Sequence, residues 1–231
     1  MSLRFSCFVT GTDTEIGKTL LSAMLLHHLS TSGLRTIGMK PVAAGVTIID
    51  GVTSNDDIDA LTAASNIDLP RSLTTPYLLR TAAAPHLAAA IDCVTISIDH
   101  IVDCYAQLAD CAEAIVVEGV GGFCVPLCDD ADTADLAQRL NLPVVLVVGM
   151  RLGCLNHALL TAQAIRSRGL TLAGWVANCV PPLMPYAAEN IAALKARLDA
   201  PLLGIVPALA QPHATAAAHF IKPNLIDGWP V

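Results

Sequence analysis

The chain alternates between short continuous apolar runs and longer segments in which apolar residues recur at helical spacing. Runs of Val, Ile and Leu without polar alternation are typical of strands that helices cover on both faces, because neither face then needs polar residues. The pattern predicts six such strands, at RFSCFV (4–9), RTIGMKPV (35–42, ending at Lys40-Pro41), AIVVEG (114–119), PVVLVVG (143–149), LAGWVAN (172–178) and LLGIVP (202–207).

Helical periodicity follows several of these runs. Leu20, Leu21, Met24, Leu25 and Leu29 recur at helical spacing and predict a helix over 18–31, which Gly33 closes. The same spacing predicts helices over 156–169 and 187–198, and NDDID (55–59) is typical of a helix start.

Strands and helices alternate along the chain, without an internal repeat or a Ser/Gly-rich linker. We therefore predict an α/β fold with a largely parallel central sheet and helices on both faces. At 231 residues with 54% hydrophobic content, residues 1–231 are expected to form a single domain. The long connections 41–55 and 119–134 follow strand ends, where open α/β sheets bind ligands.

Composition narrows the classes of ligand. A net charge of −7 and scattered Lys and Arg offer no surface for a nucleic-acid backbone. Mean hydropathy is +0.58, yet Gly, Pro or charge interrupts every apolar stretch before the roughly 18 residues of a spanning helix, so we expect no membrane association. The N-terminus is expected to be a first strand and not an export signal.

Eight cysteines without such a signal predict free thiols in a reducing, cytoplasmic compartment. Cys124 and Cys128 have the spacing of a metal-ligand pair, but no second Cys or His pair accompanies them. We interpret them as small apolar residues.

The stretch GTDTEIGKT (11–19) has the spacing of a phosphate-binding loop and lies between a predicted strand and a predicted helix. Gly11 and Gly17 allow successive N–H groups to point inward at an anion, and the following helix presents its positive end to the same anion. Lys18 is placed for the outer phosphates, and the Thr19 hydroxyl for Mg²⁺. The position of this motif between a strand and a helix predicts a nucleoside triphosphate site, and with it an α/β fold of the P-loop NTPase kind.

ATP is the favoured nucleotide. A regulatory GTPase carries Asn-Lys-x-Asp after a late strand, whereas here that strand ends Ala177-Asn178-Cys179-Val180. Partition-type switch ATPases resemble one another in having a second lysine directly after the first loop glycine, and here that position is Thr12. Both comparisons favour an ATP-using enzyme over a switch protein.

Charged residues at strand ends supply further candidates. Glu118 closes an apolar strand, where an acid is costly to bury without a cation, so it is a candidate Mg²⁺ ligand. Asp56, Asp57 and Asp59 are further candidates, although acids are common in a first helical turn. Lys40 could neutralise charge on a transferred phosphoryl group or on a carboxylate attacking it.

Together these motifs resemble the dethiobiotin synthetase family over nearly the whole chain. The matching segments, in the family's order, are GTDTEIGKT, GMKPVAAG, NDDIDAL, Pro85-His86, VEGVGG, PVVLVVGMRLGCLNHALLT, GWVAN and PLLGIVP. The resemblance implies an ATP- and Mg²⁺-dependent cyclo-ligase that converts 7,8-diaminononanoate and CO₂ or bicarbonate into dethiobiotin in biotin synthesis. A carbamate and a carbamic-phosphoric anhydride would be its intermediates, and the family's homodimer its assembly.

The resemblance also assigns residues. It places the phosphates on Glu15, Ile16, Gly17, Lys18, Thr19 and Leu20. Lys18 and Lys40 would be catalytic, and Thr19, Asp57 and Glu118 would hold Mg²⁺, although Asp56 stays an alternative to Asp57. Nucleotide or substrate atoms would lie near Gly119, Val120 and Gly121, and the nucleoside near Asn178, Cys179, Pro207, Ala208, Leu209 and Gln211, with adenine read by the amide of Asn178. The substrate would contact Thr14 and Ala44 and, in the other subunit, Gly153, Cys154, Leu155 and Asn156.

Two positions depart from the family's pattern. Ala44 stands where well-known members have a hydroxyl residue, so one hydrogen bond to the substrate would be absent. Gln211 stands where an acid is familiar, and an amide can still bond a ribose hydroxyl. A partition-type or metal-insertion switch ATPase and a catalytically weak nucleotide-binding module remain the alternatives.

Overall fold

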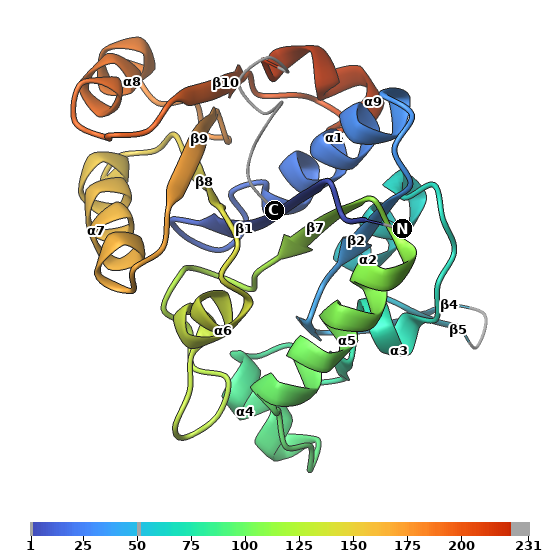
Figure 1. Ribbon diagram of the computed structural model, residues 1–231. Coiled ribbons are helices and arrows are strands. Elements are labelled where there is room, and N and C mark those ends of the chain that lie inside the picture. Colours follow the sequence, from blue (N-terminus) through green and yellow to red (C-terminus); the bar gives the residue numbers. More distant parts are fainter. Residues whose placement is uncertain (1, 50–51, 223–231) are drawn as a thin grey trace.

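A six-stranded parallel sheet forms the centre of the computed structural model, which describes residues 2–49 and 52–222 (Figure 1). The strands lie in the order β10-β9-β8-β1-β7-β2, so β1 and β8 are central neighbours. Their bounds are Phe5–Gly11 for β1, Thr36–Met39 for β2, Ala114–Glu118 for β7, Val144–Gly149 for β8, Leu172–Asn178 for β9 and Leu202–Val206 for β10. Each corresponds to one predicted run, and the predicted parallel α/β fold is confirmed.

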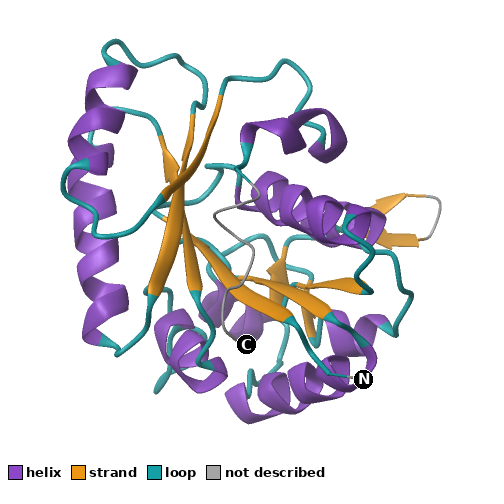
Figure 2. Ribbon diagram, turned by 45° about the horizontal axis from the view of Figure 1, so that its top comes forward, coloured by secondary structure: helices purple, strands orange, loops and turns teal. Residues whose placement is uncertain are grey.

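Helices cover both faces of this sheet (Figure 2). One hydrophobic cluster joins the sheet to α1, α2 and α9, and the other joins its opposite face to α4, α5, α6, α7 and α8. The helices are α1 (Lys18–Thr31), α2 (Asp56–Ala64), α3 (Arg71–Thr74), α4 (Pro85–Ile91), α5 (Ile98–Cys111), α6 (Thr133–Leu140), α7 (Cys154–Ser167), α8 (Ala187–Lys195), α9 (Ala214–Ala217) and the 3₁₀ helix η1 (Ala218–Phe220).

Side chains on β7 show how the sheet divides the core. Ile115 and Val117 pack in one cluster, whereas Ala114 and Val116 pack in the other. Because successive side chains of a strand point to opposite faces, a strand buried on both sides requires a continuous apolar run. This is the physical origin of the pattern along the chain.

The connection after β2 differs from the predicted long loop. It contains β3 (Val42–Ala44), which pairs with β6 (Tyr77–Leu79), and the hairpin of β4 (Thr47–Ile49) and β5 (Val52–Ser54). The β2 strand ends at Met39, earlier than predicted, and the N–H of Lys40 donates to the Thr74 carbonyl at 2.8 Å. Pro41 has no N–H with which to continue the ladder.

Strands of three residues are too short to show a periodic pattern, so β3 to β6 could not be predicted from it. Within residues 2–49 and 52–222, no helix has both the length and the apolar character needed to cross a membrane.

Candidate functional site

The phosphate loop connects β1 to α1 at the carboxyl edge of the sheet. Gly17 has the left-handed φ of 89° and directly precedes α1, and no side chain caps the helix start. The first N–H groups of α1 are therefore available to an anion.

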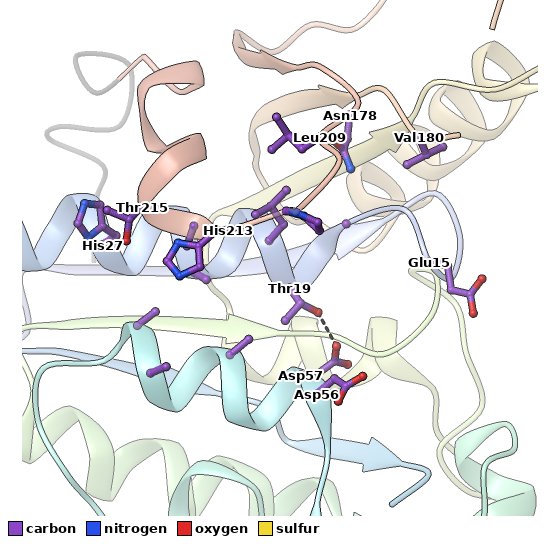
Figure 3. A pocket seen from close by; sticks show the side chains of 18 of the residues that line it. Glu15, Thr19, His27, Asp56, Asp57, Asn178, Val180, Leu209, His213 and Thr215 are labelled. Carbon is purple, nitrogen blue, oxygen red and sulfur yellow. Dashed lines mark hydrogen bonds between the residues drawn. The ribbon is translucent and has the colours of Figure 1, made fainter. Parts of the chain in front are cut away.

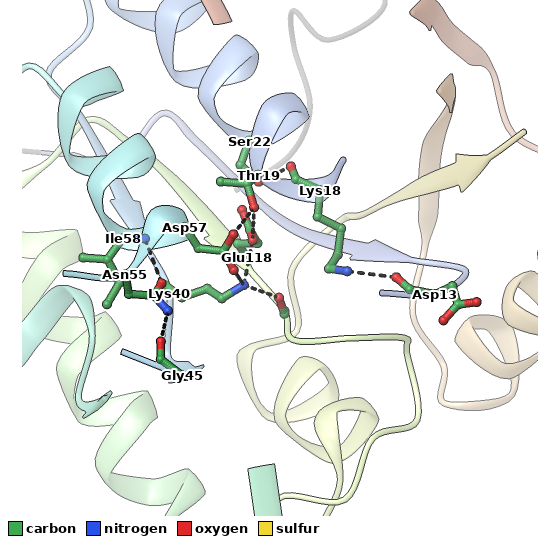
Figure 4. Close-up of polar contacts among 11 residues, drawn as sticks. Asp13, Lys18, Thr19, Ser22, Lys40, Gly45, Asn55, Asp57, Ile58 and Glu118 are labelled. Atoms are coloured by element: carbon green, nitrogen blue, oxygen red, sulfur yellow. Dashed lines mark hydrogen bonds and ion pairs between the residues drawn. The ribbon is translucent and has the colours of Figure 1, made fainter. Parts of the chain in front are cut away.

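Lys18 folds back over the loop, and its Nζ donates to the Asp13 carbonyl at 2.9 Å (Figure 4). Burial and the nearby positive charge of Lys40 lower the pKa of Lys18 to about 8. Asp13 is itself ion-paired with Arg151, which follows β8.

Lys40, Asp57, Glu118 and Thr19 meet beneath this loop, although they come from four separate segments (Figure 4). The Thr19 hydroxyl lies 2.6 Å from Asp57 Oδ1 and 3.0 Å from Glu118 Oε1. Lys40 Nζ lies 2.7 Å from Glu118 Oε1 and 2.7 Å from Asp57 Oδ2, and it also donates to the Gly119 carbonyl at 3.1 Å. The structure thus brings together the three residues that the resemblance assigned to Mg²⁺ and one of its two catalytic lysines, Lys40, whereas Lys18 contacts Asp13.

The Lys40–Glu118 ion pair is shielded from water, since Lys40 is 3% exposed and Glu118 fully buried, whereas the Asp57 side chain is 40% exposed. Burial by itself lowers the pKa of Lys40, but the charges of Glu118 and Asp57 outweigh burial and hold that pKa above its ordinary value. Burial raises the pKa of Asp57, and the Lys40 ammonium outweighs this effect, so that pKa lies below its ordinary value. Both groups are therefore charged at neutral pH.

The start of α2 positions Asp57. The Asn55 side chain caps this helix by accepting from the Ile58 N–H at 3.3 Å, and it donates to the Gly45 carbonyl at 2.7 Å. Asn55 therefore ties the helix start to the segment after β3, which fixes the first turn. In that turn Asp57 faces Thr19, whereas Asp56 is exposed.

The residues present fit a magnesium ion. Glu118 Oε2 is buried and has no hydrogen-bond partner, so one carboxylate oxygen is unused. Hydroxyl and carboxylate oxygens are the protein ligands that Mg²⁺ prefers. Within residues 2–49 and 52–222 no cluster of three or more His, Cys, Asp or Glu has metal-site geometry. Of the two cysteines interpreted as small apolar residues, Cys128 is half-buried and Cys124 is exposed.

A cavity of about 820 Å³ opens on one side of the loop (Figure 3). The predicted residues that line it are Glu15, Gly17, Thr19, Leu20, Asp57, Asn178, Cys179, Pro207 and Leu209. Ala208 and Gln211 do not line it. Asn178 Nδ2 donates to the Ile16 carbonyl at 2.7 Å, so part of the amide assigned to adenine is already engaged with the loop.

A second cavity, of about 930 Å³, opens on the other side. The predicted residues that line it include Thr14, Lys18, Lys40, Ala44, Val120 and Gly121. Glu15, Gly17, Thr19 and Asp57 line both cavities. The two spaces therefore meet at the phosphate loop, an arrangement that suits a reaction between a nucleotide and a second substrate.

Gly153, Cys154, Leu155 and Asn156 lie outside both cavities, at the start of α7. Gly153 has a left-handed φ of 97° and Cys154 is buried. In this chain, therefore, the structure does not bring the segment to the rest of the site.

Several residues that line the cavities were not predicted. His27, His213 and Thr215 line the first cavity, and Ala82 to Pro85 line the second. The Pro85-His86 pair was a signal for the latter segment. His27 occupies an ordinary helix position, and no sequence pattern distinguished it.

Comparison with known proteins agrees with this geometry. The family model described as an AAA domain matches residues 6–215. The ATP-dependent dethiobiotin synthetase BioD of Janthinobacterium sp. (strain Marseille) is 58% identical over 234 residues, which cover 100% of this chain and 99% of that protein.

Solved structures with a similar fold include a cell division protein complex and a ParA family ATPase. The MinC:MinD cell division complex of Aquifex aeolicus matches with a TM-score of 0.61 and 12% identity, over 98% of each chain. A ParA family ATPase from Chlorobium tepidum TLS matches with a TM-score of 0.57 and 14% identity, over 90% of this chain and 86% of that one. At such identities the likeness concerns the fold alone.

The 58% identity over the full length therefore shows the family, which the likeness of fold alone does not. The chain belongs to the family of ATP-dependent dethiobiotin synthetases.

Proposed function

We propose that the protein is an ATP-dependent cyclo-ligase that forms dethiobiotin from 7,8-diaminononanoate and CO₂. The observation that supports this function most strongly is the position of Lys18 and Lys40 in the second cavity, next to Thr19 and Asp57, which line both cavities. Cations at that point are suited to a reaction in which an anion of one substrate attacks the terminal phosphate of the other.

The chemistry proceeds in three steps. One amine of the substrate adds to CO₂ and loses a proton, which gives a carbamate. A carbamate oxygen attacks the γ-phosphorus of ATP, and the bond from that phosphorus to the β–γ bridging oxygen breaks, so that ADP leaves. The second amine then attacks the carbonyl carbon of the carbamic-phosphoric anhydride and loses a proton, and phosphate departs as the ureido ring closes.

None of these steps needs a covalent bond to the protein. The protein's contribution is to position two substrates and to stabilise negative charge. Lys18 would release the Asp13 carbonyl and bind the outer phosphates. Lys40, whose three contacts are Glu118, Asp57 and the Gly119 carbonyl, would exchange one of them for a carbamate or phosphoryl oxygen.

Thr19, Asp57 and Glu118 would hold Mg²⁺. When bound, the ion would neutralise charge on the nucleotide phosphates. The unpartnered Glu118 Oε2 supports this assignment, as does the hydroxyl of Thr19 between the two carboxylates.

The nucleoside of ATP would occupy the first cavity. Four residues that line this cavity would surround the base: Asn178, Cys179, Pro207 and Leu209. Ala208 and Gln211 belong to the same segment and would contact the nucleoside through a small rearrangement of residues 207–211. Thr14, Ala44, Gly119, Val120 and Gly121 would lie near the substrate in the second cavity.

A homodimer would complete the substrate site. Leu152 is 94% exposed beside Gly153, so an apolar side chain at the start of α7 is available to a second copy of the chain. The start of α7 in a second copy would then receive the substrate carboxylate, since a helix N-terminus favours an anion.

All eight cysteines are free thiols, which supports a reducing, cytoplasmic compartment.

The test is purified protein with ATP, Mg²⁺, bicarbonate and 7,8-diaminononanoate, in which phosphate and dethiobiotin are followed together. We expect equal amounts of both, and no ADP without the diamine. ADP formation that is indifferent to the diamine would overturn the ligase assignment and favour the switch ATPase that the MinD and ParA folds represent.

A further inference from the structure

Asn178 ends β9 and lines the first cavity, where its amide reaches the phosphate loop (Figure 3). It is 8% exposed, and its Nδ2 donates to the Ile16 carbonyl at 2.7 Å in a buried hydrogen bond. One side of this amide is therefore committed to the loop backbone, 162 positions earlier in the chain.

Ile16, whose carbonyl accepts this bond, is anchored by its side chain as well. The side chain is fully buried, and a Cβ added at Gly11 would lie 2.6 Å from Ile16 Cδ1. A Cβ added at Gly149 would lie 2.5 Å from Ile16 Cγ2. The ends of β1 and β8 thus approach Ile16 as closely as only glycine allows, while β9 holds its carbonyl.

Gly17, the next residue, also packs on Asn178. Its φ of 89° is left-handed, and a Cβ there would lie 2.2 Å from Asn178 Nδ2. The amide of Asn178 therefore touches the two residues that set the direction of the first N–H groups of α1. Those N–H groups are the ones a phosphate would use.

We propose that Asn178 is a positioning residue of the phosphate site, which fixes the shape of the loop through the Ile16 carbonyl before any nucleotide binds. This role goes beyond the contact with adenine and rests on the proposed ATP site. A loop that is already ordered loses less conformational entropy on binding, so the bond increases affinity for the phosphates. Without the Asn178 amide, the buried Ile16 carbonyl loses this hydrogen-bond donor and the loop gains alternative conformations.

Inorganic tripolyphosphate with Mg²⁺ separates this role from base reading, because it has no base. We expect Asn178→Ala to bind tripolyphosphate roughly tenfold more weakly than the unaltered protein in calorimetry. Unchanged tripolyphosphate affinity together with weaker ATP binding would show a base contact only and overturn the proposal. If the unaltered protein bound neither ligand, the ATP site itself would be wrong.

Two further variants keep the test independent of folding. Leu209→Ala changes the base end without touching the loop, so it should weaken ATP binding and leave tripolyphosphate affinity unchanged. Ile16→Val keeps the carbonyl and removes the methyl that lies against Gly11, so it should weaken tripolyphosphate binding while the protein still unfolds cooperatively. Equal affinity of Ile16→Val and the unaltered protein for tripolyphosphate would contradict the anchoring of the loop.

Turnover gives a second readout. Asn178→Ala should lower kcat/KM with inosine triphosphate as well as with ATP, because the two nucleotides share their phosphates and differ in the base, and a contact with adenine would add a further loss with ATP alone. A loss confined to ATP would assign Asn178 to the base and reject the positioning role.

Discussion

Lys40 Nζ lies 2.7 Å from Glu118 Oε1, and both side chains are buried beneath the phosphate loop. Lys40 directly follows β2 and Glu118 ends β7, and because these strands are parallel neighbours the two residues meet from 78 positions apart. The opposite charge of each side chain offsets the desolvation cost of burying the other. The pair holds the site in order while leaving one Glu118 oxygen unused.

Lys40→Ala should reduce kcat by about 10²–10³, because it removes the cation beside the transferred phosphoryl group. Steady-state kinetics measure this loss, and calorimetry should still detect ATP. The variant should also unfold more easily, since Glu118 is left buried and unpaired. Lys195→Ala, at an exposed position on α8, is the matched control and should behave like the unaltered protein. Full activity of Lys40→Ala would refute the catalytic role.

Glu118→Gln should raise the Mg²⁺ concentration for half-maximal activity by roughly tenfold or more, because the ligand loses its charge while keeping its shape. A Mg²⁺ titration at fixed ATP measures the shift. Glu189→Gln changes the same residue type at an exposed position on α8 and should leave the titration unchanged. Identical Mg²⁺ dependence in both variants would remove Glu118 from the metal site.

Asp57→Asn and Asp56→Asn form a matched pair one residue apart. We expect Asp57→Asn to raise the Mg²⁺ concentration for half-maximal activity strongly, because Asp57 contacts Thr19 and Lys40. Asp56→Asn should have little effect on that concentration, because Asp56 is exposed. The same titration compares them. The reverse result would identify Asp56 as the ligand.

Ala44→Ser should lower KM for the diamine by roughly three- to tenfold, the value of one added hydrogen bond, since Ala44 lines the second cavity. The KM for ATP should stay constant, because Ala44 does not line the first cavity. Initial rates with each substrate varied in turn measure both constants. An unchanged or higher KM for the diamine would place the substrate elsewhere.

Asp132→Ala should destabilise the protein by about 1 kcal/mol and lower Tm by roughly 2–4 °C. Asp132 Oδ1 accepts from the Asp135 N–H at 2.8 Å and Asp135 Oδ2 accepts from the Asp132 N–H at 2.8 Å, a reciprocal cap at the start of α6. Thermal unfolding measures the change, with Asp130→Ala, an exposed neighbour, as control. Equal Tm values for the two variants would argue against the cap.

The same cap predicts a pH dependence. The Asp132 N–H holds the pKa of Asp135 below its ordinary value, with help from Arg168. A carboxylate with a lowered pKa stabilises the fold above its unfolded pKa of about 3.9 and loses that contribution as pH falls through the folded pKa. The difference in stability between the protein and Asp135→Asn should therefore be present at pH 7 and shrink below pH about 4. A difference that stays constant down to pH 2 would contradict this.

The sequence by itself determined the sheet, the phosphate loop and the family. Six continuous apolar runs became the six parallel strands because strands buried on both faces have no polar side, and α1 occupies the predicted range Lys18–Thr31. The loop could be recognised because its chemistry is local: glycines, a lysine and a threonine lie within nine consecutive residues. Short elements such as β3 and β6 escaped prediction because three residues show no period.

Only the tertiary structure decided how the site is assembled. Lys40 and Glu118 meet because parallel strands place their carboxyl ends on one edge, and the Asn55 cap at the start of α2 positions Asp57 beside them. The bond from Asn178 to Ile16 has no counterpart in any sequence pattern, since the resemblance assigned that amide to the base. Local periodicity specifies elements, whereas contacts between distant strand ends arise only when the sheet has formed.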